Sequence, residues 1–156
     1  MHLDRIDMAI LGALQEDAGQ SNVELARRVG LSPSPCLRRV RALEEARVIR
    51  GRTAIIDAAA VGLPISVFLQ VTLERQTEVN LDVFETAVAG WSEVVECYLM
   101  TGDADYLLRV VAPDLEAFQR FLMDRLTKNP AVASIKSSFA LKQIKYGAGL
   151  PLPPSL

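Results

Sequence analysis

The chain has 156 residues, of which 50% are hydrophobic and 23% charged, with a formal net charge of −2; this composition supports a buried core in one domain or two small ones rather than a disordered chain. It contains no run of roughly 18 apolar residues and no N-terminal secretion signal, so we expect a cytoplasmic protein that does not act in a membrane. The charge is uneven: residues 27–52 carry a net +6 in eight arginines and two glutamates, whereas residues 63–156 carry a net −3. Clustered arginine is typical of a surface that binds phosphate groups.

The N-terminal residues predict two short amphipathic helices. Apolar residues recur at helical spacing from Leu3 to Leu14, and Asp4 and Asp7 are expected to lie off that face. Residues 21–24, Ser-Asn-Val-Glu, match a capping box, in which a hydroxyl and a carboxylate satisfy free amides at the start of the second helix. Gly30 is expected to end that helix, because glycine adopts a left-handed turn without steric penalty.

A third helix is predicted after Ser32, whose side chain can cap it. Pro33 and Pro35 are tolerated in its first turn, because proline removes only amides that lack a partner within the helix. Two short helices joined by residues 30–32, after a stabilising first helix, are typical of a helix-turn-helix. The N-terminal third of the chain is therefore predicted to bind DNA.

The third helix has an apolar and a basic face. Ser34, Arg38 and Arg41 point away from the core on a helical wheel. Pro35 and Arg39 lie at the edges of that exposed face. A helix that projects hydroxyl and guanidinium groups can enter the major groove, where arginine pairs with guanine edges or phosphates. Four apolar residues are expected to face the core: Cys36, Leu37, Val40 and Leu43.

A basic turn follows the third helix. Arg50-Gly51-Arg52 stands between residues 48–49 and 53–56, two apolar segments that predict a small β wing touching the DNA backbone beside the groove. The alternative, that the arginines only solvate an exposed face, does not explain why helix, turn, cap and charge coincide. The predicted DNA contacts are Ser32, Ser34, Pro35, Arg38, Arg39, Arg41, Arg50 and Arg52.

The rest of the chain predicts an α+β domain of the order β-α-β-β-α-β. Its strands are expected at residues 66–73, 94–100, 106–111 and about 133–144, and its helices at residues 81–89 and 115–126. This is the ferredoxin-like plan, an antiparallel sheet with two helices on one face and the other face free for a partner. We predict a winged helix-turn-helix domain with linker in residues 1–62, the ferredoxin-like domain in residues 63–146 and a flexible tail in residues 147–156.

The loop between the second and third of these strands carries two carboxylates. Residues 101–106, Thr-Gly-Asp-Ala-Asp-Tyr, can receive an ammonium group, bind a metal weakly or simply make the turn. An enzyme with its active site at this loop is the competing hypothesis, but no nucleophile, cofactor motif or second polar cluster accompanies the two carboxylates. His2 is the only histidine, and Cys36 and Cys97 are expected to be free thiols. We therefore predict no catalysis, no cofactor and no metal.

Several motifs occur in order along the chain. They are residues 3–7 (LDRID), 21–26 (SNVELA), 30–33 (GLSP), 35–40 (PCLRRV), 43–44 (LE) and 101–108 (TGDADYLL). Together they resemble the Lrp/AsnC family, the feast/famine regulators of prokaryotes, over nearly the whole chain from Leu3 to about Lys145. The resemblance implies a C-terminal domain that senses amino acids and drives assembly, with dimers that build into octamers or similar discs and a small effector held between dimers.

The resemblance also implies an effector site. An aspartate carboxylate and the loop backbone would receive the ammonium and carboxylate groups of the amino acid. By the same resemblance, Leu115 corresponds to a position at which a change of residue alters how family members respond to their effector. Carried over by position, the effector residues are Gly102, Asp103, Asp105, Tyr106, Leu115, Ser138, Phe139 and Ala140.

We therefore expect a sequence-specific transcription regulator that binds double-stranded DNA. Its binding would be modulated by an amino acid, and it would act as a homodimer assembling into an octamer or similar, in the cytoplasm near the nucleoid. The alternative is an architectural DNA-binding protein that compacts DNA without an effector. Non-specific binding of that kind depends mainly on phosphate contacts and is therefore strongly sensitive to salt.

Overall fold

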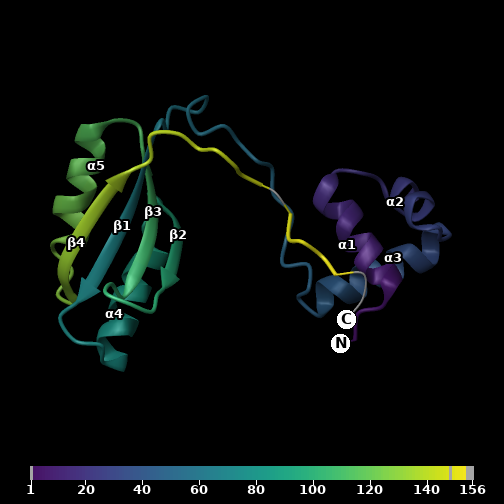
Figure 1. Ribbon diagram of the computed structural model, residues 1–156, viewed down its shortest axis with the longest axis horizontal. Coiled ribbons are helices and arrows are strands. Elements are labelled where there is room, and N and C mark those ends of the chain that lie inside the picture. The colour runs from purple at the N-terminus through teal and green to yellow at the C-terminus, as the bar shows by residue number, and fades with distance from the viewer. Residues whose placement is uncertain (1, 148, 154–156) are drawn as a thin grey trace. The chain divides into compact units, whose positions relative to one another are not determined.

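The computed structural model describes residues 2–147 and 149–153 (Figure 1). The chain forms two compact units, Met1–Ile55 with Lys145–Leu156, and Ile56–Ile144. The chain therefore passes between the units twice. The domain boundaries at residues 62 and 146 and the flexible tail remain predictions; in the structure, residues Lys145–Leu156 group with the first unit. None of the helices in the described residues is long and apolar enough to cross a membrane.

Three helices form the first unit: α1 (Arg5–Glu16), α2 (Asn22–Val29) and α3 (Pro33–Glu45). The predicted capping box is confirmed, because Ser21 accepts from the Glu24 amide and Glu24 accepts from the Ser21 amide. Gly30 ends α2 in the left-handed conformation, with a φ of 72°. Residues of all three helices and the segment before them form one core: Leu3, Met8, Ile10, Ala13, Leu25, Ala26, Cys36, Val40 and Leu43.

Two side chains of this unit face differently from the prediction. Asp7 was expected off the apolar face of α1, yet only 4% of its surface is exposed. Leu37 was expected in the core, yet it is 38% exposed. Around the axis of α3, Cys36 and Leu43 lie on one side of Val40 and Leu37 on the other, so the buried side is centred away from Leu37.

The β wing predicted for residues 48–56 does not form paired strands. Residues 46–64 contain no helix or strand. The amides of Val48 and Ile49 donate to the Leu43 carbonyl at 2.9 and 3.1 Å and so close the end of α3. Because these amides are already used, they do not pair with the following segment. Arg50-Gly51-Arg52, which we call the arginine turn, therefore lies outside any sheet.

The second unit follows the predicted ferredoxin-like order. Its elements are β1 (Ile65–Leu73), α4 (Glu78–Ala89), β2 (Val94–Leu99), β3 (Tyr106–Ala112), α5 (Leu115–Phe121), the π-helical turn η1 (Leu122–Leu126) and β4 (Val132–Phe139). The strands form one antiparallel sheet in the order β2-β3-β1-β4 (Figure 1). β4 is shorter than predicted, because beyond Phe139 only the Ala140 amide still bonds to β1, at the Ser66 carbonyl.

Both helices of this unit cover the same face of the sheet. Alternate residues of β1 from Val67 to Leu73 are buried, in one cluster with Phe84 of α4 and Phe118 of α5. The opposite face carries the intervening residues of β1, among them Phe68, which is 38% exposed. On the same face, the edge strand β2 carries the exposed Tyr98. One chain therefore leaves this second face uncovered.

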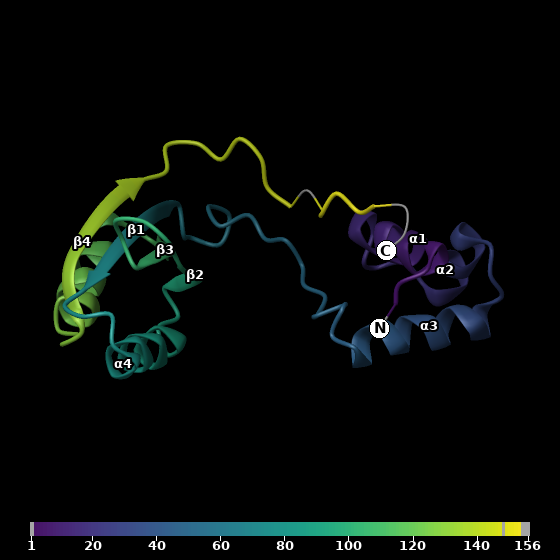
Figure 2. The same cartoon turned by 60° about the horizontal axis from the view of Figure 1, so that its bottom comes forward.

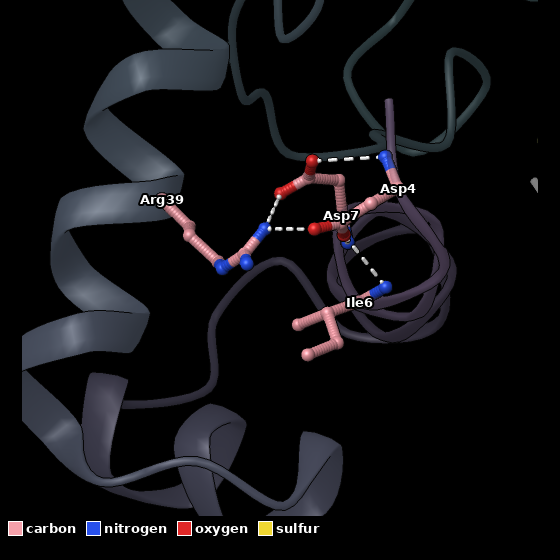
Figure 3. Close-up of polar contacts among 4 residues, drawn as sticks. All are labelled: Asp4, Ile6, Asp7 and Arg39. Atoms are coloured by element: carbon pink, nitrogen blue, oxygen red, sulfur yellow. Dashed lines mark hydrogen bonds and ion pairs between the residues drawn. The ribbon is translucent and has the colours of Figure 1, made fainter. Parts of the chain in front are cut away.

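An ion-pair cluster joins α1 to α3 in the first unit, and we call it the Arg39 latch. Arg39 Nη1 lies 2.8 Å from Asp4 Oδ2 and 2.8 Å from Asp7 Oδ1 (Figure 3). Asp4 also caps α1, accepting from the amides of Ile6 and Asp7 at 2.8 Å, while Asp7 Oδ2 accepts from the Asp4 amide at 3.1 Å. The latch therefore fastens one side of α3 to the capped end of α1.

Removing the cation of the latch should destabilise the fold. Arg39→Ala leaves the Asp7 carboxylate buried without its partner, so we expect the free energy of unfolding to fall by about 2–3 kcal/mol. Urea denaturation of the full chain measures this change. The matched control is Arg38→Ala at the adjacent exposed position, which should stay within about 0.5 kcal/mol of the parent. Equal stability of the two variants would contradict the latch.

The latch should also respond to acid. Hydrogen bonds from the Asp7 amide and then from the Arg39 guanidinium lower the pKa of Asp4 below its ordinary value of 3.8. The ionised carboxylate therefore stabilises the fold above that value, and this contribution is lost as the pH falls through the lower folded pKa. Melting temperatures measured from neutral to acid pH should show a gap between the parent and Asp4→Asn that closes in acid. A gap that persists or widens in acid would refute this role.

Candidate nucleic-acid interface and effector site

The exposed face of α3 carries three of the predicted DNA contacts. Ser34, Arg38 and Arg41 are exposed, and Pro35 is half-buried beside them. Neither Arg38 nor Arg41 forms an ion pair with another described residue. Two unpaired guanidinium groups on one side of a helix can donate pairs of hydrogen bonds to guanine or bind phosphates.

The first turn of α3 is held by a neighbouring helix. Ser32 occupies the N-cap, but its hydroxyl makes no capping hydrogen bond. Asn22, at the start of α2, instead donates from Nδ2 to the Pro33 carbonyl at 2.8 Å, a role that sequence analysis did not identify. With prolines at positions 33 and 35, Ser34 supplies the single amide N–H among the first three helical residues. This amide and the two serine hydroxyls can bind a DNA phosphate.

The other predicted DNA contacts lie in different surroundings. Arg39 belongs to the latch, and its bonds to carboxylates, that to Asp7 first, raise its pKa. It was expected at the edge of the exposed face of α3, and its guanidinium group is turned toward α1. Arg50 is exposed and forms no ion pair with a described residue. Arg52 is exposed and pairs with Glu44 at 2.9 Å; exposed pairs of this kind contribute little and exchange readily, so Arg52 can still contact DNA.

The loop between β2 and β3 contains three of the predicted effector residues. Gly102 has a φ of 114°, a conformation that strains other residues. Asp103 is exposed and forms no hydrogen bond with another described residue. Asp105, in contrast, is only 5% exposed. The two carboxylates of the loop therefore differ in what they can do.

Asp105 is occupied by its own unit. Its Oδ2 accepts from the Leu73 amide at 2.7 Å, and its Oδ1 accepts from the side-chain amide of Gln76. Its backbone adds hydrogen bonds to β1 and to the residue after β2. Asp105 therefore closes the end of β1 and shapes the loop, and of the two carboxylates only Asp103 faces solvent. No feature of the sequence connects Gln76 to this loop.

Tyr106, another predicted effector residue, is part of the core. Its hydroxyl donates to Glu85 Oε1 of α4 at 2.6 Å, and its ring centroid lies 4.6 Å from that of Phe84. Burial, followed by the bond to Glu85, raises the pKa of Tyr106. Its side chain supports the loop from the helix-covered face of the sheet.

The remaining effector residues lie at the opposite end of the sheet. Tyr106 pairs with Val71 of β1, whereas Phe139 of β4 pairs with Val67. Four residues of a strand span about 13 Å. The loop and the end of β4 are therefore not brought together within one chain.

The predicted effector residues at this end of the sheet lie on different surfaces. Ser138 and Ala140 lie on the uncovered face of the sheet, beside Phe68 and Ser66 in the register. Phe139 lies on the helix-covered face, where its ring centroid is 5.4 Å from that of Phe118. The exposed Leu115 is the first residue of the helix that carries Phe118.

A cavity of about 720 Å³ lies elsewhere in this unit. Its lining includes Pro113, Ala117 and Arg120, between the end of β3 and α5, and none of the predicted effector residues. Within the part of the chain that the structure describes, no three His, Cys, Asp or Glu side chains gather in a way that could hold a metal ion. The predicted effector residues are therefore not gathered around one cavity within the chain.

Two family matches cover most of the sequence. Residues 3–50 match the family described as Winged helix-turn-helix DNA-binding, and residues 66–150 match the Lrp/AsnC ligand binding domain. These regions correspond to the three-helix unit and to the four-stranded sheet with its helices.

Individual proteins are similar over nearly their whole length. The chain is 49% identical to the Bkd operon transcriptional regulator of Pseudomonas aeruginosa, covering 96% of this chain and 98% of that protein. It is 42% identical to the leucine-responsive regulatory protein of Escherichia coli, covering 92% and 87%. Its structure is similar to that of a transcriptional regulator from Neisseria meningitidis in complex with L-methionine, with a TM-score of 0.89, 41% identity and 96% coverage of both chains. The chain therefore belongs to the Lrp/AsnC family of DNA-binding transcription regulators.

Proposed function

We propose that this protein is a sequence-specific regulator whose binding to DNA is modulated by an amino acid held between subunits. The observation that carries the first part is the exposed face of α3, where Arg38 and Arg41 have no partner among the described residues while the Arg39 latch holds the opposite side. Similarity to the regulators named above supports this proposal. Nothing in the comparisons supports the alternative of an architectural protein without an effector.

The uncovered face of the sheet supports assembly into homodimers. Phe68 and Tyr98 expose large apolar surfaces there, and a second copy of the same face can cover them. A homodimer would place two recognition helices in successive major grooves, on half-sites about one helical turn apart. Such dimers would assemble further into an octamer or a similar oligomer. The protein would act in the cytoplasm near the nucleoid.

The separation of the predicted effector residues favours a site shared between copies. The loop with Asp103 and the end of β4 are too far apart within one chain for one amino acid to touch both. A second copy that brings its own β4 to this loop would complete the site. We assign the ammonium group of the amino acid to Asp103 and to the loop backbone, with Asp105 shaping the loop. The methionine complex of the Neisseria relative supports an amino-acid ligand.

The exposed face of α3 predicts the effect of one double variant. Arg38→Ala with Arg41→Ala should weaken operator binding by about 100-fold or more, because each arginine that contacts a base contributes about 1–3 kcal/mol. Gel shifts at fixed salt measure the affinity, and circular dichroism checks the fold. Arg125→Ala, an exposed arginine of the second unit, is the control and should bind as the parent does. An unchanged affinity of the double variant would reject this face.

The loop predicts different effects for its two aspartates. Asp105→Ala leaves the Leu73 amide without its acceptor and should lower the free energy of unfolding by about 1–3 kcal/mol. Asp103→Ala should leave that free energy within about 0.5 kcal/mol of the parent but remove the thermal stabilisation by the effector. A thermal-shift screen of the twenty amino acids first identifies the effector. Full stabilisation of Asp103→Ala by that effector would refute the assignment.

A further inference from the structure

The C-terminal segment of the chain is bound to α1 through one side chain. Gln15 Oε1 accepts from the Leu150 amide at 2.6 Å, and Gln15 Nε2 donates to the Leu150 carbonyl at 3.1 Å. A single side chain thus satisfies both backbone groups of Leu150, as a neighbouring β-strand would. In Figures 1 and 2 the yellow C-terminal segment returns to the helices of the first unit.

Two glycines are required along this path. A Cβ atom at Gly149 would lie 2.7 Å from Gln15 Cδ and 3.0 Å from Gln15 Cβ, so a larger residue would displace the Gln15 side chain from its bonds to Leu150. Gly147 has a φ of 67°, and a Cβ there would lie 3.0 Å from Ile55 Cδ1. The backbone of this segment therefore approaches the first unit closely at two points.

Leucine side chains add apolar contact. Leu152 packs against the core of the first unit and, with Leu150, lines a groove of about 320 Å³. The other wall of the groove comes from the end of α1 and from the segment after α3: Leu11, Leu14, Gln15, Ala18, Val48, Ile49, Arg50, Gly51, Arg52 and Thr53. We call residues 149–153 the C-terminal strap. It is bound to α1 and faces the arginine turn across this groove.

The arginine turn has few other supports. Residues 50–57 belong to no strand and form no backbone hydrogen bond to another described residue. The exposed ion pair of Arg52 with Glu44 is a weak restraint. A segment without such hydrogen bonds retains much of its conformational freedom, and the strap, as one wall of the shared groove, limits the space open to it.

We propose that the C-terminal strap is a structural part of the DNA-binding unit and positions the arginine turn against DNA phosphates. Gln15, Gly149 and Leu152 are positioning residues in this arrangement. The proposal rests on the DNA contacts proposed for Arg50 and Arg52. It also gives the C-terminal residues, which belong to the first unit from Lys145 onward, an indirect role in DNA binding through the arginine turn.

The test uses full-length variants of the strap contact. Gly149→Val and Gln15→Ala each break the contact from one side, and Pro151→Ala, an exposed strap residue outside the groove, is the matched control. Operator binding is measured over a range of salt concentrations. Losing two phosphate contacts should weaken binding by about 10-fold near physiological salt and reduce the salt slope by about one to two, because each phosphate contact adds roughly 0.9 to that slope. The control should retain the parental slope.

A second measurement needs no DNA. Amide exchange at Leu150 should be slowed in the parent and in Pro151→Ala, and fast in Gln15→Ala and Gly149→Val. Fast exchange in the parent would overturn the strap, whatever the DNA result. Slow exchange in the parent with a parental salt slope in both strap variants would overturn its positioning role. A different result would contradict the proposed function and not the strap. In that case Leu150 exchanges as expected in all variants, but Arg38→Ala with Arg41→Ala binds the operator as the parent does. The two sets of results therefore distinguish failure of the strap from failure of DNA recognition by α3.

Discussion

The Arg39 latch is the interaction on which the DNA-binding surface depends. Arg38 and Arg39 are adjacent in sequence and lie about 100° apart around α3, so holding one determines the direction of the other. Asp7 is almost fully buried, and a buried carboxylate without a cation is strongly unfavourable. The latch therefore holds α3 in one rotation, with Arg38 and Arg41 facing outward. This restraint matters because the first turn of α3 begins with proline and lacks a side-chain cap of its own.

The second unit uses a buried carboxylate in a similar way. Asp105 accepts hydrogen bonds from Leu73 and Gln76 and so connects the β2–β3 loop to the end of β1. A buried carboxylate is tolerated in a fold when its oxygens accept hydrogen bonds. Because both oxygens of Asp105 already accept such bonds, the side chain has little capacity to bind a ligand. In both units a side chain that was predicted to be functional holds the scaffold instead, Arg39 in the first unit and Asp105 in the second, and an exposed residue close to it in sequence is free to bind. Asp103 and Arg38 are those neighbours.

In the proposed function, the sheet connects assembly to ligand binding. Its helix-covered face is complete within one chain, whereas its other face and its two ends are not. The predicted effector residues are divided between the β2–β3 loop and the end of β4, so the proposed site needs a second copy of the chain. A ligand that binds only where two copies meet changes the balance between assemblies in proportion to its differential affinity for them. The C-terminal strap comes after β4 in the chain, and under the proposal above it positions the arginine turn.

The sequence by itself determined the helix-turn-helix, the order of strands and helices, the capping box at Ser21 and the left-handed turn at Gly30. Local signals suffice for these, because periodicity and caps depend on residues a few positions apart. Only the tertiary structure decided that Arg39 faces Asp7, that Leu37 is exposed, that the wing residues pair with no strand and that Leu150 binds Gln15. Each of these depends on residues far apart in sequence or on how helices pack, and a charged or polar side chain takes whichever partner the packed fold brings within hydrogen-bonding distance. The residue type alone cannot show which partner that is.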